Sequence, residues 1–250
     1  MKAIEFGTLN NDILILLHGG GLSWWNYRDA AKLLSQKYRV ILPILDGHAG
    51  SGQPFRSIEE NAEQLVCWID KEYGGQVTAI AGVSLGGQIA VEMLSIQPDI
   101  CRFALLESTL AKPMPLTYAM VKPTYDMSFG LIRKRWFAKI QADYLGIPED
   151  LFEDYYRDTC EITKPDMIAF LEANSGYAIK PALPATNARV LILAGSRELK
   201  QIRDSAALLH KAIPGSSMRI LPGYRHGELS LNHGQEYATI LDNWIQTKDT

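Results

Sequence analysis

Residues 79–93 read Ala79-Ile80-Ala81-Gly82-Val83-Ser84-Leu85-Gly86-Gly87-Gln88-Ile89-Ala90-Val91-Glu92-Met93. An apolar run over residues 78–83, rich in β-formers, stops at a Gly-x-Ser-x-Gly turn, after which apolar residues recur at helical spacing. The pattern predicts a buried strand, a tight corner and a helix, with Gly82 and Gly86 leaving out side chains that would clash at the crossing. Ser84 then stands at a helix N-terminus, where free N–H groups can hold an oxyanion, and we expect it to be a nucleophile. The alternative is an ordinary glycine-rich turn.

Composition sets the class of protein. The chain has 250 residues, a length that fits one α/β domain with a modest insertion. Its residues are 47% apolar and 21% charged, which is typical of a globular protein with a large core. Its net charge is −3, so the chain lacks the excess of basic residues with which proteins bind nucleic acid or anionic membranes. No apolar stretch has the length of a membrane span and the first residues lack the apolar core of a signal peptide, so we expect a cytoplasmic protein.

The three cysteines, Cys67, Cys101 and Cys160, are odd in number and widely scattered. They form no Cys-x-x-Cys pair, which argues against a disulfide framework and against a zinc site. We expect free thiols in a reducing compartment.

Strand-like and helix-like segments alternate in both halves of the chain. The strands are predicted over residues 13–17, 39–42, 78–83, 103–106, 190–194 and 218–221, and the helices over 27–36, 58–73, the stretch after Ser84, 202–213 and 237–247. Short aliphatic strands separated by helices imply a mostly parallel sheet with helices on both faces. About ten residues precede the first core strand, which leaves room for one short edge strand and a sheet of about seven.

The alternation stops in the middle of the chain. Residues 112–184 contain no aliphatic strand, are rich in methionine and aromatic residues, and are cut by prolines into short pieces. We interpret this stretch as a helical cap inserted into a core made of residues 1–111 and 185–250.

Five ordered motifs resemble those of the α/β-hydrolase family, over nearly the whole chain. They are His18-Gly19-Gly20-Gly21, the loop of residues 43–51, the elbow Gly82-Val83-Ser84-Leu85-Gly86, Gly195-Ser196-Arg197-Glu198, and Gly223-Tyr224-Arg225-His226-Gly227. The order serine, acid, histidine is that of the family. The resemblance implies the α/β-hydrolase fold, with a nucleophile at Ser84.

A serine hydroxyl needs a base, and the resemblance assigns that role to His226, on a loop where ligands of open α/β sheets bind. His233 on the same loop is the rival. The acid falls on Glu198, although most relatives carry aspartate there. Glu107, at the end of the preceding strand, is the alternative.

The oxyanion hole is expected to use the backbone N–H groups of Leu85 and Gly20, with Gly21 as the alternative to Gly20. The sequence gives weaker indications of the residues that line a substrate pocket. Trp24 or Trp25 follows the glycine loop and either lines the acyl pocket or packs under a helix, and Met120 and Trp136 are our cap candidates for substrate contact.

Together these features favour a serine hydrolase that cleaves a small-molecule ester through a Ser84-His226-Glu198 triad and an acyl-enzyme. The same scaffold hosts carbon–carbon bond hydrolases, amidases, acyltransferases and lyases, and a non-catalytic small-molecule binding protein is the alternative from another class. We expect no metal, nucleotide or organic cofactor, and the oligomeric state stays open.

Overall fold

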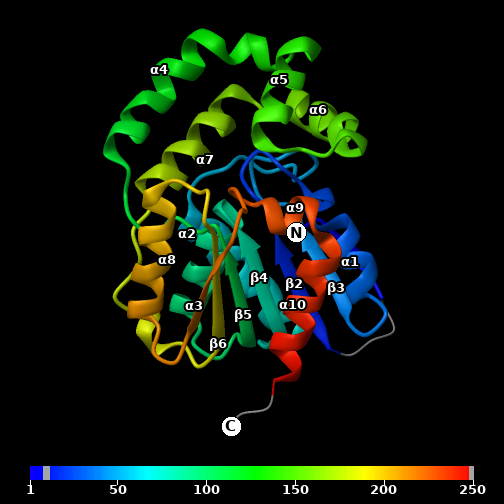
Figure 1. The fold of residues 1–250 in the computed structure, drawn as a ribbon, viewed down its shortest axis with the longest axis vertical. Helices are drawn as coiled ribbons and strands as arrows, with labels where there is room; N and C mark the ends of the chain where they lie inside the picture. The colour runs from blue at the N-terminus through cyan, green and yellow to red at the C-terminus, as the bar shows by residue number, and fades with distance from the viewer. Residues whose placement is uncertain (8–11, 248–250) are drawn as a thin grey trace.

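The computed structural model describes residues 1–7 and 12–247. Its strands are β1 (Ala3–Phe6), β2 (Ile13–Leu17), β3 (Arg39–Pro43), β4 (Val77–Val83), β5 (Cys101–Glu107), β6 (Arg189–Gly195) and β7 (Ser217–Leu221). They form one seven-stranded sheet in the order β1-β3-β2-β4-β5-β6-β7 (Figure 1), in which only β1 runs antiparallel to its neighbour. The mostly parallel sheet of about seven strands, with one short edge strand before the first core strand, is thereby confirmed.

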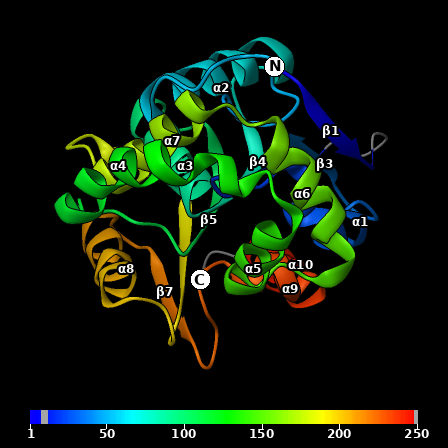
Figure 2. The ribbon, with the colours of Figure 1, turned by 90° about the horizontal axis from the view of Figure 1, so that it is seen from above.

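Helices surround this sheet. They are α1 (Arg28–Leu34), α2 (Ile58–Tyr73), α3 (Leu85–Ile96), α4 (Pro115–Ile132), α5 (Arg135–Leu145), α6 (Phe152–Glu161), α7 (Lys164–Gly176), α8 (Lys200–Ala212), α9 (Glu228–Asn232) and α10 (Gly234–Gln246), with 3-10 turns at Trp24–Tyr27, Glu149–Leu151 and Leu183–Ala185. Helices α2, α3 and α8 cover one face of the sheet, and α1 and α10 the other (Figures 1 and 2). The helix expected over residues 27–36 is shorter, because Tyr27 belongs to a 3-10 turn and residues 35 and 36 form a turn after the helix, and α9 was not predicted.

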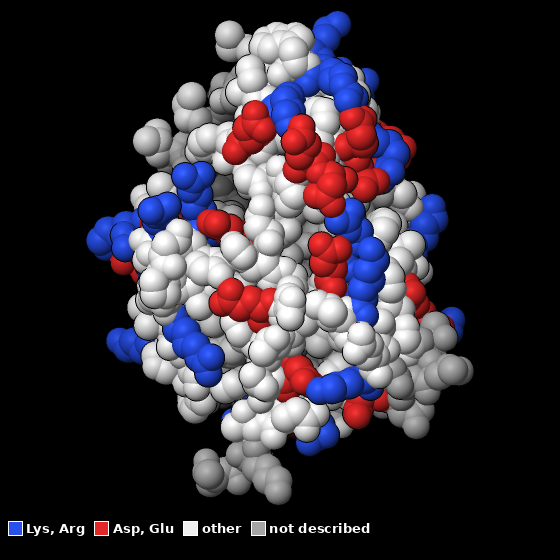
Figure 3. Space-filling model, turned by 45° about the vertical axis from the view of Figure 1, so that its right-hand side comes forward, with Lys and Arg blue, Asp and Glu red and all other residues white. Residues whose placement is uncertain are grey.

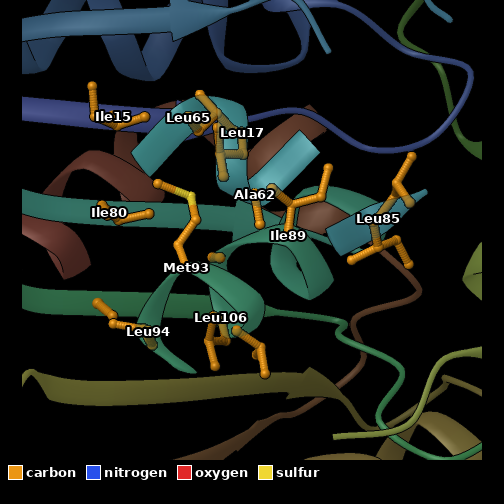
Figure 4. Close-up of a cluster of buried hydrophobic side chains, with 14 of the residues drawn as sticks. Ile15, Leu17, Ala62, Leu65, Ile80, Leu85, Ile89, Met93, Leu94 and Leu106 are labelled. Carbon is orange, nitrogen blue, oxygen red and sulfur yellow. The ribbon is translucent and has the colours of Figure 1, made fainter. Parts of the chain in front are cut away.

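The core is divided by the sheet because successive side chains of a strand point to opposite faces. In β2, Ile15 and Leu17 pack with α2 and α3, whereas Leu14 and Leu16 pack with α1 and α10. Figure 4 shows the first cluster, in which Ile89 and Met93 of α3 lie among side chains of the sheet and Leu85 lies near the ends of the strands. A strand buried on both faces needs continuous apolar residues, which is why these strands were visible in the sequence.

Helix α3 begins in very close contact with the sheet. A Cβ atom on Gly86 would lie 2.1 Å from the carbonyl oxygen of Leu17 in β2, and one on Gly82 would lie 2.3 Å from the carbonyl oxygen of Gly86. These distances are far below van der Waals contact, so only glycine fits at this crossing.

Helices α4 to α7 form a separate group at the edge of the sheet where the parallel strands end (Figures 1 and 2). We call residues 115–176 the cap helices. The same edge carries Ser84, Glu107 and Glu198, which follow or end β4, β5 and β6. Across residues 1–7 and 12–247 no helix is long and apolar enough to cross a membrane.

We expect Gly86→Ala to destabilise the fold by ~3 kcal/mol or more, because the added methyl group meets rigid backbone. Urea denaturation followed by circular dichroism measures the effect. The matched control is Gly130→Ala in α4, where the added methyl group meets open space. That variant should gain ~0.5–1 kcal/mol from better helix propensity. Equal stability of the two variants would contradict the close crossing.

Candidate active site

Ser84 lies on the corner between β4 and α3. Its φ of 53° and ψ of −115° place a non-glycine residue in a strained region of backbone space. The backbone of Ser84 is bonded to both neighbouring elements. Its N–H group donates to the carbonyl of Glu107 at the end of β5 at 2.9 Å, and its carbonyl accepts from Gln88 N in α3 at 3.0 Å. This corner projects the hydroxyl from the edge of the sheet.

Three of the predicted residues form a hydrogen-bonded line at this edge. Nε2 of His226 lies 3.0 Å from Oγ of Ser84, and Nδ1 of His226 lies 2.9 Å from Oε2 of Glu198. The side chain of Glu198 is fully buried and that of His226 is half exposed. A neutral imidazole with its proton on Nδ1 donates to the carboxylate and turns a lone pair toward the serine hydroxyl.

The buried carboxylate of Glu198 has further partners. Its Oε1 accepts from Gly195 N at 2.6 Å and from the Ser108 hydroxyl at 2.9 Å. The same Ser108 oxygen accepts from Gly227 N, the residue after His226, at 2.9 Å. Ser108 therefore links the acid to the histidine loop.

Sequence reasoning missed Ser108, because it belongs to no motif. Its φ of 52° is the other positive value of a non-glycine residue among residues 1–7 and 12–247. Backbone strain of this kind concentrates at functional sites.

Glu107, the alternative acid, has a different environment. Its Oε1 accepts from Leu229 N at 3.1 Å and from Ser230 N at 3.2 Å, the first turn of α9, while Oε2 is buried with no hydrogen-bond partner. Burial, with a smaller contribution from Glu198, raises the pKa of Glu107 to about 7. The side chain holds the start of α9, directly after the histidine loop, and not the imidazole. The ring of His233 contacts Tyr224 and Glu228, whereas Nε2 of His226 faces Ser84.

Two buried histidines support the glycine loop. His18 accepts from Leu45 N at 3.2 Å through Nε2 and faces the Gly19 carbonyl with Nδ1 at 2.9 Å. His48 accepts from Gly21 N at 3.0 Å through Nε2 and faces the Asp46 carbonyl with Nδ1. These contacts fit neutral rings with the proton on Nδ1. Burial lowers the pKa of His18 to about 3 and that of His48 to about 4, in agreement with this state.

The glycine loop lies beside the start of α3 and beneath the cap helices. A Cβ atom on Gly20 would lie 3.5 Å from the side chains of Leu85 and Phe170. Phe170, on α7, also stacks on His48 with 4.7 Å between ring centroids. The sequence pointed to cap aromatics in general, but not to this one.

The four pocket candidates are dispersed. Trp25 is fully buried, donates its indole N–H to Asp158 of α6 at 2.8 Å, and packs with α5 and α6, whereas Trp24 lies near Phe6. Met120 lines a groove of about 410 Å³ between α4 and α7, and Trp136 is 61% exposed at the start of α5. Their contact with substrate stays a prediction.

Charged residues form no obvious ion site. No group of three or more His, Cys, Asp or Glu side chains suited to a metal ion occurs in the part of the chain that the structure describes. Figure 3 shows Lys and Arg side chains interspersed with Asp and Glu over the face drawn.

Comparison with known proteins gives relatives of the whole chain and of parts of it. The magnesium-chelatase 30 kDa subunit of Rhodobacter capsulatus is 35% identical over 94 residues, 36% of this chain and 32% of that protein. The pimeloyl-[acyl-carrier protein] methyl ester esterase of Neisseria meningitidis is 22% identical over 246 residues, 92% of each chain. The chain spans less than half the length of three of its curated relatives, the magnesium-chelatase subunit and two others, whose matched shares are 32%, 11% and 44%.

Among solved structures, the enol-lactonase from Burkholderia xenovorans has a TM-score of 0.81 at 16% identity, covering 98% of this chain and 96% of that one. A model of the alpha/beta hydrolase family matches residues 14–240. The matched region contains, in chain order, the glycine loop, the elbow, Glu198 and His226. This chain belongs to the α/β-hydrolase family.

Proposed function

We propose that the protein is a serine hydrolase that cleaves a small-molecule ester through an acyl-enzyme. The observation that carries the proposal is the line from Ser84 Oγ through His226 to Glu198, with distances of 3.0 and 2.9 Å. His226 takes the proton of Ser84 as the hydroxyl attacks the acyl carbon, and then gives it to the leaving group. Water releases the acyl group through the same base, while Glu198 orients the imidazole and stabilises its charged form.

We place the oxyanion hole at the backbone N–H groups of Leu85 and Gly20. In the glycine loop, Gly19 N donates to Asn26 at 3.3 Å and Gly21 N donates to His48. This favours Gly20 over the alternative Gly21, because the N–H group of Gly21 is already engaged. Gly20 also lies against Leu85. Two donors from different elements can thus meet one developing negative charge.

An ester is the substrate class that we favour. Two proteins similar to this chain are named a methyl ester esterase and an enol-lactonase, and both names denote the hydrolysis of an ester bond. Amides, carbon–carbon bonds, acyl transfer and lyase chemistry are alternatives on the same scaffold. A binding protein without catalysis would not require a base between a strained serine and a buried acid, so the geometry favours an enzyme.

A fluorophosphonate probe and a substrate panel test this proposal. The probe should label Ser84, as mapped by mass spectrometry, and p-nitrophenyl esters of different chain lengths should be hydrolysed faster than matched anilides. An unlabelled protein with no hydrolysis of either class would contradict it.

Ser84→Ala is expected to remove nearly all turnover, by about 10⁴–10⁶-fold, because the residues of such a triad act as a unit. Steady-state kinetics on the best ester measures the loss. Circular dichroism should show an intact fold, since alanine adds no atoms at the corner. A folded variant with substantial activity would contradict the assignment of the nucleophile.

Glu198→Gln should lower the turnover rate strongly, by up to about 10⁴-fold, because it disturbs the imidazole tautomer. Glu107→Gln should retain most of the activity, because an amide oxygen can still accept from Leu229 N and Ser230 N. Comparing the two variants in one assay decides which carboxyl group is the acid. The reverse ranking would move the acid to Glu107.

Glu107 should also make stability depend on pH. Its pKa is about 7 in the folded chain and lies near 4.5 in the unfolded chain, so the folded state binds the proton more tightly. Its contribution is therefore fully present below about pH 4.5 and is lost as pH rises through 7, by an amount on the order of 3 kcal/mol. Urea denaturation from pH 5 to 9 should show Glu107→Gln gaining stability relative to the parent as pH rises. His18 and His48 are present in both proteins, so the difference isolates Glu107, and parallel curves would refute the assignment.

A further inference from the structure

Gln88 is a buried amide that the proposed chemistry does not use. It lies on α3, four residues after the nucleophile, and its side chain has no solvent exposure. Its backbone N–H group bonds to the carbonyl of Ser84, so it belongs to the first turn of the helix that carries the serine. A polar group in such a place has to find partners within the protein.

The side chain finds all of its observed partners at the two ends of the cap. Nε2 donates to the carbonyl of Leu110, which precedes α4, and to the carbonyl of Asn174, near the end of α7, both at 2.9 Å. Oε1 accepts from Nδ2 of Asn174 at 2.8 Å. We call residues 108–114 the entry stem of the cap and residues 174–180 its exit stem. One rigid, planar amide therefore binds both stems at once.

Other bonds join the same elements. Met114 N donates to the carbonyl of Ser175 at 2.8 Å, which ties one stem to the other. One turn further along α3, Glu92 accepts from the hydroxyl of Tyr177 in the exit stem at 2.8 Å. Helix α3 therefore holds the exit stem on two successive turns, and Gln88 is the position where the entry stem joins it.

The polarity of the contact fixes its geometry. An apolar side chain could pack against the stems in several positions, but an amide with two donors and an acceptor satisfies these partners in one arrangement. Gln88 therefore fixes the position of the cap helices relative to α3, the helix that begins after Ser84.

We propose that Gln88 is a positioning residue that fixes the cap over the nucleophile, so that it determines which acyl chains reach Ser84 without touching the reacting atoms. The part that concerns acyl chains rests on the proposed esterase function. The part that concerns the cap does not.

The test uses the full chain with three variants. Gln88→Met is close in volume and removes the amide with all three of its bonds, and Asn174→Leu removes the bond from Nδ2 of Asn174 to Oε1 of Gln88 while leaving the backbone carbonyls in place. Met93→Ala is the control, because it leaves a cavity on the same helix but its side chain points toward the sheet (Figure 4). Hydrogen exchange reports the protection of residues 115–176, and kcat/KM for p-nitrophenyl acetate and octanoate reports selectivity.

In both amide variants, amide hydrogens of the cap helices should exchange about tenfold or more faster than in the parent. Exchange in the sheet strands should stay close to that of the parent. The ratio of kcat/KM between the two esters should shift by about tenfold, mainly through KM, because pocket shape discriminates by amounts of this size. Fluorophosphonate labelling of Ser84 should persist. Met93→Ala should change neither the cap protection nor the ester ratio.

Unchanged cap protection in both amide variants, or an equal change in Met93→Ala, would overturn the proposal. Loosened caps with an unchanged ester ratio would overturn its claim on selectivity. If Gln88→Met fails to fold, Asn174→Leu decides on the same readouts. A parent that neither binds the probe nor hydrolyses esters would refute the proposed function, while hydrogen exchange would still test whether Gln88 holds the cap helices in place.

Discussion

The close crossing of α3 over β2 and β4 is the constraint on which the rest of the structure depends. At Gly82 and Gly86 the backbones of strand and helix approach so closely that a Cβ atom would overlap carbonyl oxygens. This proximity forces the sharp corner at Ser84, with its positive φ, and brings the first N–H groups of the helix to the carboxyl edge of the sheet. The strain at the corner is offset by burial of the apolar face of α3 against the sheet.

Near this corner, two buried carboxyl groups, those of Glu198 and Glu107, have different hydrogen-bond partners. The carboxylate of Glu198 has donors from Gly195, Ser108 and His226, which suits a charged group. Glu107, one strand away, has backbone donors on one oxygen only, and its pKa is raised. Two carboxyl groups at neighbouring strand ends thus differ in their hydrogen-bond donors, and burial raises the pKa of the one with fewer.

Local patterns predicted most of the fold. The continuous apolar runs of β2, β4, β5 and β6, the helical spacing of α2 and the glycines of the elbow are short-range signals, and they led to the right sheet and family. Ser84, His226 and Glu198 could be named because each follows a strand in a recognisable order. Ser108, Gln88 and Phe170 could not, because their roles depend on partners distant in sequence, such as Gly227, Asn174 and His48. Helix α9 was not predicted because its five residues are too few to show helical periodicity.

The position of the cap in the chain has a consequence for the order of folding. The cap separates β5 from β6, and yet Phe103 pairs with Arg189 in the sheet. Closing such a long loop costs entropy before the strand pairing is gained, although each doubling of loop length adds only ~0.6 kcal/mol. Because Met114 bonds to Ser175 at the base of the cap, a preformed cap shortens the loop that remains to be closed. We therefore expect β2 to β5 to assemble first from nearer neighbours, and the strand that brings Glu198 to join once the cap has brought its two ends together.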